Sequence, residues 1–83
     1  MKRFIVWVKL EVQKQFELVN PIYKRSIILT LRGLSNNPYP GDEAYLGVFN
    51  RGVLYQIYRG PYKLVYKVDE ETSTVEVYEI TPI

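Results

Sequence analysis

The amino-acid sequence predicts an α+β domain in which a mostly antiparallel sheet is covered on one face by two helices, in the order β-α-α-β-β-β. Helical spacing of apolar residues is confined to the N-terminal half, whereas strand-like runs separated by short polar turns fill the C-terminal half. The chain has 83 residues and contains no repeat, low-complexity segment or linker. A chain of this length has room for one modest core, so we expect a single domain over residues 1–83.

The N-terminal residues predict a strand followed by a helix. Residues 4–8 (Phe-Ile-Val-Trp-Val) are β-branched or aromatic, which favours a buried strand. Apolar side chains then recur with the spacing of one helical face at Val12, Phe16 and Val19. We therefore expect a first helix across these three positions.

A second helix is predicted from Pro21 to about Leu34. Asn20 can cap its first turn, and proline is favoured at the first helical position because the N–H that it lacks would have no helical partner there. A helical wheel places five large side chains on the side that should face the core: Tyr23, Ile27, Ile28, Leu31 and Leu34.

The opposite side of this helix carries two apolar residues, Ile22 and Leu29, beside a stripe that contains Arg25 and Arg32. One interpretation is apolar surface available to a partner protein. The other is a frayed helix start at Ile22 and one exposed leucine, which is common on protein surfaces. The pattern itself leaves both interpretations open.

The C-terminal half predicts two hairpins after an irregular connection. Residues 35–42 (Ser-Asn-Asn-Pro-Tyr-Pro-Gly-Asp) combine the residue types that favour turns. Three strands are predicted beyond them, over 53–58, 62–68 and 74–80, and short turns join each to the next. Strands that follow one another through such short turns are expected to pair antiparallel.

Strand alternation predicts which side chains face the core and which face away from it. The more apolar set, expected in the core, is Tyr55, Ile57, Tyr62, Leu64, Tyr66 and Val68. The set expected on the uncovered face is Gln56, Tyr58, Lys63 and Lys67, with Arg59 at its rim. An aromatic ring beside cations can stack a nucleobase while the cations hold phosphate, which indicates an RNA-binding surface. A solvated, lysine-bearing strand face is the other interpretation.

The charge pattern supports one surface that could face a polyanion. The formal net charge is only +2, which is not typical of a protein that coats nucleic acids generally. However, residues 51–67 contain four basic residues and no acidic one, whereas acidic residues gather nearer the C-terminus. A basic patch is therefore expected in the middle of the chain.

The residue inventory excludes most enzyme classes. The sequence has no histidine and no cysteine, which excludes Ser-His-Asp and Cys-His catalysis, disulfides and zinc-thiolate sites. It contains no glycine-rich phosphate-binding motif, so we expect neither a cofactor nor a metal.

The apolar runs are too short to span a membrane and no secretory signal is visible, so a soluble, cytoplasmic protein is expected. Lysine, arginine and tyrosine can still support cleavage of RNA by its own 2′-hydroxyl in a cationic pocket, with a lysine crowded by other cations as the base.

Several segments resemble the RelE/ParE toxin superfamily. They are L-S-N-N-P-Y-P-G-D at 34–42, L-G at 46–47 and L-Y-Q-I-Y-R-G-P-Y-K-L-V-Y-K-V-D-E-E at 54–71. The resemblance implies the RelE-like fold and the toxin of a type II toxin–antitoxin system, with a cognate antitoxin as partner. It also implies a metal-independent endoribonuclease that cleaves mRNA on the ribosome and so inhibits translation.

The resemblance also implies roles for individual residues. Lys63 occupies the position of a strand arginine that acts on the scissile phosphate, so it is the candidate catalytic residue. The candidate RNA-binding residues are Arg51, Gln56, Tyr58, Arg59 and Lys67. The candidate antitoxin-binding residues are Ile22, Arg25, Leu29 and Arg32.

The resemblance leaves two other functions open. RelE-like nucleases carry a basic residue or histidine and then a tyrosine after the last strand, whereas residues 79–83 here read Glu-Ile-Thr-Pro-Ile. One alternative is a ParE-like inhibitor of DNA gyrase, which needs no nuclease residues. The other is a catalytically inactive RelE homologue that acts through antitoxin binding.

Overall fold

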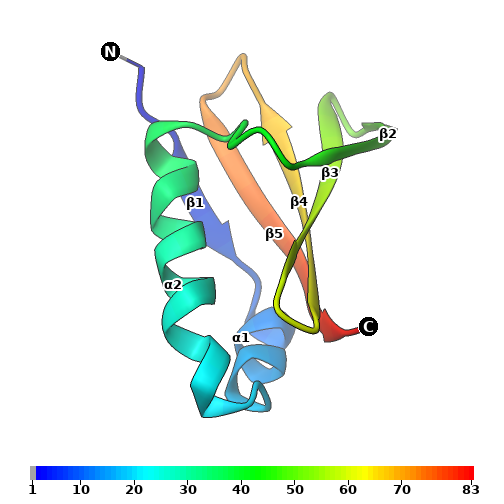
Figure 1. Ribbon diagram of the computed structural model, residues 1–83. Coiled ribbons are helices and arrows are strands. Elements are labelled where there is room, and N and C mark those ends of the chain that lie inside the picture. Colours follow the sequence, from blue (N-terminus) through cyan, green and yellow to red (C-terminus); the bar gives the residue numbers. More distant parts are fainter. Residues whose placement is uncertain (1) are drawn as a thin grey trace.

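A five-stranded sheet with both helices on one of its faces makes up the computed structural model, which describes residues 2–83 (Figure 1). In chain order the elements are β1 (Ile5–Val8), α1 (Leu10–Glu17), α2 (Pro21–Asn36), β2 (Ala44–Phe49), β3 (Gly52–Arg59), β4 (Tyr62–Asp69) and β5 (Thr74–Pro82). The strand order across the sheet is β1-β5-β4-β3-β2. All neighbouring strands pair antiparallel except β1 and β5, which are parallel. The predicted α+β class, with two helices on one face, is confirmed.

The second helix begins where the local sequence predicts, whereas the first, expected across Val12, Phe16 and Val19, ends at Glu17 and leaves Val19 buried just beyond it. The side chain of Asn20 accepts a hydrogen bond from the backbone N–H of Ile22, and Pro21 occupies the first helical position. Val12 of α1 and Ile27 and Leu34 of α2 are almost fully buried against the sheet. Neither helix is long and apolar enough to cross a membrane.

The core lies between the helices and the inward side of the three central strands. The strand residues predicted there are found there, and the most deeply buried ones are Ile57, Leu64, Tyr66, Val68, Val75, Val77 and Ile80. Each large apolar side chain buried in this way contributes about 1.5–3 kcal/mol of transfer free energy. Because the core needs all these residues on one side, their alternate neighbours must emerge on the other side of the sheet.

One strand was missing from the sequence-based prediction. β2 pairs with the N-terminal part of β3, but its pairing register shifts between Tyr45 and Gly47. Gly47 has a φ of 144°, a backbone conformation that residues other than glycine rarely adopt. This bulge breaks the period-two alternation by which a strand is recognised, so the segment resembles no regular strand in the sequence.

Two burial predictions were also wrong. β1 was expected to be buried, but it lies at the edge of the sheet, and Ile5 and Trp7 are 60% and 59% exposed on the side away from the helices. Only the residue before it, Phe4, is buried. Ile28 was expected in the core but is 37% exposed, because it lies at the border of the α2 face beside a groove against α1.

The irregular segment after α2 is anchored by two tyrosines, Tyr66 and Tyr39. The hydroxyl of Tyr66 donates a hydrogen bond of 2.7 Å to the carbonyl of Pro38, which is itself buried. Burial raises the pKa of the Tyr66 hydroxyl, which therefore stays protonated as a donor. The neighbouring Tyr39 donates to the Glu70 carboxylate in the turn between β4 and β5. These contacts fix the path of the chain from α2 to β2.

Candidate functional site on the open sheet face

The sheet face opposite the helices, called here the open face, gathers side chains from β3, β4 and β5. Tyr58 of β3 lies opposite Lys63 of β4, and Lys67 lies opposite Leu54 on the same face. Gln56 lies between these two pairs and its side-chain amide donates a hydrogen bond of 3.1 Å to the Tyr58 hydroxyl. The structure thus brings together the four residues for which the sequence predicted one surface.

Lys63 is the centre of a first group on this face, the Lys63 cluster, made of Gln56, Tyr58, Lys63, Glu79 and Thr81. The Lys63 ammonium lies 3.2 Å from Oε2 of Glu79. The Thr81 hydroxyl donates a hydrogen bond of 2.6 Å to the same oxygen. Both contacts stabilise the charged carboxylate and so lower the pKa of Glu79. The hydrogen bond from Thr81 has the larger effect and the contact with Lys63 the smaller one. Glu79 is therefore a carboxylate at neutral pH.

A second group, the Lys67 cluster, lies further along β4, about four residues or roughly 13 Å from the Lys63 cluster. It is made of Lys9, Phe49, Lys67, Glu76 and Tyr78. Glu76 is shared by two ammonium groups, at 3.8 Å from Lys9 and 3.6 Å from Lys67. Tyr78 donates to the same carboxylate, lies under the Lys9 ammonium at 4.1 Å and packs edge-on against Phe49. Only 12% of the Lys67 side chain is exposed.

The bulge in β5 explains why the sequence did not predict Glu79 on the open face. Strict alternation from Val75 and Val77 would turn residue 79 toward the core and Ile80 toward solvent. Instead the register shifts next to Tyr78, so that Glu79 pairs with Val65 and Ile80 is buried. A bulge of this kind re-aims side chains and is common beside functional sites. The sequence also missed Glu76, Tyr78 and Thr81, which lie on β5, and Lys9 and Phe49, which come from segments whose position depends on the tertiary fold.

The two glutamates change the electrostatics that the sequence predicted for this face. Lys63 and Lys67 were expected to form a basic surface, with a lysine crowded by other cations as a possible base. The structure instead places a carboxylate beside each lysine, Glu79 beside Lys63 and Glu76 beside Lys67. Each of these lysines therefore has a carboxylate, and not only cations, as its neighbour.

Two predicted RNA-binding residues lie away from the open face. Arg59 was expected at its rim, but its Nε donates to the Thr30 hydroxyl at 2.8 Å and its guanidinium pairs with Asp42 at 2.6 Å, on the helix side of the sheet. This pairing lowers the pKa of the Asp42 carboxyl. Arg51 lies in the turn between β2 and β3 and borders a groove with Val53 and with residues near the start of the β4–β5 turn. Within residues 2–83, no hydrogen bond or ion pair joins either arginine to a side chain of the Lys63 cluster, and Arg59 reaches only the backbone carbonyl of Tyr58, at 2.7 Å.

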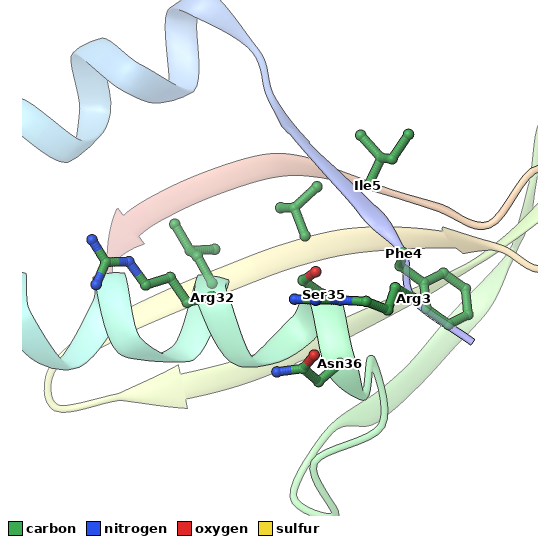
Figure 2. A pocket seen from close by; sticks show the side chains of 8 residues that line it. Arg3, Phe4, Ile5, Arg32, Ser35 and Asn36 are labelled. Carbon is green, nitrogen blue, oxygen red and sulfur yellow. The ribbon is translucent and has the colours of Figure 1, made fainter. Parts of the chain in front are cut away.

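The candidate antitoxin-binding residues are all exposed along α2. Ile22 is 77% exposed and Leu29 is 52% exposed, and together with Arg25 they line one shallow groove. Arg32 lines a different groove, between the C-terminal half of α2 and β1 (Figure 2). Figure 2 shows Ser35 and Asn36 of α2 bordering this second groove next to Arg3. The structure therefore unites three of the four predicted residues.

The side chains of the open face offer several kinds of chemistry. Within residues 2–83, no cluster of acidic side chains has the geometry of a metal site. Lys63 offers an ammonium, Glu79 a carboxylate, and Tyr58 a ring that is half exposed. This set can hold an anion, transfer a proton and stack against a planar group.

Comparisons with known proteins show which fold this is. No family model matches the chain, and no curated protein matches it in sequence. Among solved structures, the archaeal RelE–RelB complex from Pyrococcus horikoshii OT3 matches with a TM-score of 0.88, at 19% identity, over 96% of this chain and 94% of that one. The toxin–antitoxin complex RelBE2 from Mycobacterium tuberculosis gives 0.77 at 18% identity, over 98% and 99%.

The isolated E. coli RelE toxin matches with a TM-score of 0.76, at 17% identity, over 95% of this chain and 83% of that chain. Because this structure contains the toxin without its antitoxin, the architecture that is shared is that of RelE itself. The chain therefore has the fold of the RelE toxins.

Proposed function

We propose that this protein is the toxin of a type II toxin–antitoxin system and that it acts in the cytoplasm as a RelE-like, metal-independent endoribonuclease on ribosome-bound mRNA. The observation that carries the proposal is the Lys63 cluster, which lies on the uncovered face of a sheet with the RelE fold. A cation, a carboxylate and a half-exposed ring meet there on neighbouring strands. Together these groups can hold a phosphate, transfer a proton and stack a base of single-stranded RNA.

In this proposal Lys63 binds the scissile phosphate and stabilises the charge that develops on it. Tyr58, 50% exposed and opposite Lys63, stacks on a neighbouring base. Gln56 contacts the RNA beside Lys63, whereas the largely covered Lys67, and Arg51 and Arg59, have no role at the reacting phosphate. The cognate antitoxin covers the groove of Ile22 and Leu29 on α2 and keeps the toxin inactive.

The Lys63–Glu79 ion pair does not prevent phosphate from binding. Each side chain is about one-third exposed, and ion pairs of that kind contribute about 0–1 kcal/mol. A charge-assisted hydrogen bond from Lys63 to a phosphate oxygen contributes about 1.5–3 kcal/mol. The Lys63 ammonium has three N–H groups, so it can bind a phosphate oxygen while it remains beside Glu79.

The test is induced expression in bacteria combined with toeprinting of a translated mRNA. Wild-type protein is expected to arrest growth and to produce new cleavages within the codon at the ribosomal A site. Lys63→Ala is expected to reduce cleavage by about 10²–10³-fold. Lys14→Ala, a matched loss of one exposed lysine on α1, should leave cleavage unchanged. Growth arrest with intact mRNA would contradict the nuclease and direct attention to DNA gyrase, to be tested in a supercoiling assay.

A second candidate function is a catalytically inactive homologue that binds antitoxin. The observation that favours it is the pairing of the open-face lysines Lys63 and Lys67 with Glu79 and Glu76, which reduces the positive charge available to RNA. Under this alternative, the protein would form a complex with the product of the adjacent open reading frame. It would nevertheless neither arrest growth nor cleave mRNA.

A further inference from the structure

We infer that Glu79 is the proton acceptor of the Lys63 cluster, taking the proton from the 2′-hydroxyl of the RNA while Lys63 holds the neighbouring phosphate. The inference rests on the proposed nuclease function. It names the general base, which the roles given above to Lys63 and Tyr58 do not supply. RNA cleavage by its own 2′-hydroxyl needs a base, and in a chain without histidine the open face offers carboxylates, amines and tyrosine hydroxyls, of which the carboxylate is the type that is ordinarily deprotonated at neutral pH.

The position of Glu79 fits an acceptor. Its Oε2 is held by the Thr81 hydroxyl and lies beside Lys63, which fixes the orientation of the carboxylate. No side-chain hydrogen bond within residues 2–83 uses the other oxygen, Oε1. About one-third of the Glu79 side chain is exposed on the open face. An oriented carboxylate on a partly exposed side chain, with one oxygen unused by these contacts, can accept a substrate proton.

The contact between Glu79 and Lys63 also matches the geometry of a ribonucleotide. In RNA the 2′-hydroxyl and the phosphate on the 3′ side belong to the same nucleotide and are immediate neighbours. A cation and a carboxylate in contact can therefore bind the two groups together, the phosphate at the ammonium and the hydroxyl at the carboxylate. DNA lacks the hydroxyl and would leave Glu79 without a function.

The reaction step is a transesterification within the RNA. The carboxylate of Glu79 takes the 2′-hydroxyl proton as the 2′-oxygen forms a bond to phosphorus. The bond from phosphorus to the 5′-oxygen of the next nucleotide breaks, and that oxygen leaves with the electron pair and takes a proton from the Lys63 ammonium. The products are a 2′,3′-cyclic phosphate and a 5′-hydroxyl. The net transfer of one proton from Glu79 to Lys63 through solvent restores both groups.

The other glutamate of the open face does not suit this role. Glu76 is contacted by Lys9, Lys67 and the Tyr78 hydroxyl, which occupy both of its oxygens. Lys67 is largely covered, so a phosphate cannot easily reach the ammonium beside Glu76. Glu76 therefore serves as a matched control, with the same charge on the same strand and face.

The experiment compares Glu79→Gln and Glu76→Gln with the wild type in two measurements, mRNA cleavage on ribosomes and affinity for a non-cleavable RNA with 2′-deoxy substitution at the cleavage site. Glu79→Gln is expected to reduce cleavage by about 10²–10⁴-fold, the usual effect of losing a general base. Its RNA affinity should be equal or higher, since a negative charge is removed. Glu76→Gln should cleave within a few-fold of the wild type.

A third variant, Glu79→Asp, keeps the carboxylate and should retain more cleavage than Glu79→Gln. Thermal unfolding of each variant tests that the fold is intact. Equal cleavage by Glu79→Gln and the wild type, or an equal loss in both glutamine variants, would overturn the inference while leaving the nuclease function in place. No cleavage by the wild-type protein would instead overturn the proposed function, and the inference with it.

Discussion

Lys63 and Glu79 lie 3.2 Å apart on the open face although they are not paired in the β-ladder, where Lys63 is opposite Thr81 and Glu79 is opposite Val65. The side chains therefore meet diagonally between β4 and β5. Because both strands are central in the sheet, the backbone that carries the pair is rigid. The open face thus holds a cation and a carboxylate at a fixed separation.

The first prediction concerns the contribution of Lys63 to RNA binding. Removing one lysine that contacts phosphate reduces the number of counterions released on binding. Lys63→Ala is therefore expected to weaken RNA affinity and to lower the slope of log affinity against log salt by about 0.7 for a single strand. Fluorescence anisotropy over a series of salt concentrations measures both. An unchanged slope would show that Lys63 does not contact phosphate, and Lys14→Ala is the control.

The second prediction concerns Gly52, over which the Lys67 side chain lies. A Cβ at this position would lie 2.5 Å from Cγ of Lys67 and 2.8 Å from the carbonyl oxygen of Val68. Gly52→Ala is therefore expected to lower the free energy of unfolding by about 1–3 kcal/mol. Gly33 lies exposed in α2 with no atom within 4 Å of an added Cβ, so Gly33→Ala should raise stability by about 0.5–1 kcal/mol. Urea unfolding of the two variants should show opposite signs.

The third prediction concerns stability at acidic pH. The Tyr39 hydroxyl and the Lys2 ammonium hold the pKa of Glu70 below its ordinary value of 4.5, and the Arg59 guanidinium lowers that of Asp42 below 3.8. A carboxyl whose folded pKa is lowered stabilises the fold above its unfolded pKa, and this contribution disappears as the pH falls through the folded value. The urea midpoint should therefore be constant above about pH 5 and fall below about pH 4.

Glu70→Gln provides the check on this prediction. The variant cannot ionise, so the difference in urea midpoint between it and the wild type should shrink as the pH falls below 4.5. A difference that stays constant from pH 7 to pH 3 would show that Glu70 acts through packing alone.

The fourth prediction concerns the groove on α2. Ile22 and Leu29 are exposed apolar residues in one groove, so a charge placed there should weaken a partner that covers it. Ile22→Glu and Leu29→Glu are each expected to weaken the complex with the adjacent reading frame's product by at least tenfold, measured by calorimetry. Val48 of β2 is 74% exposed outside the groove, and Val48→Glu is the matched control. Equal binding by all three variants would exclude this groove as the antitoxin site.

Local sequence determined much of the architecture, because its signals act over a few residues. Asn20 and Pro21 set the start of α2, and the alternation through Leu64, Tyr66 and Val68 assigned the inward side of β4. The same alternation placed Tyr58 and Lys63 together on the open face. These features depend only on backbone periodicity and capping, which a sequence displays directly.

The tertiary structure alone decided the electrostatics of that face. Whether Lys63 acts alone or beside a carboxylate depends on the strand that lies next to β4 and on a bulge that turns Glu79 outward. Arg59 was likewise drawn to the helix side by Thr30 and Asp42, which are distant in sequence. A sequence fixes the period of a strand but not the register of its neighbours, because register follows from the packing of the whole core.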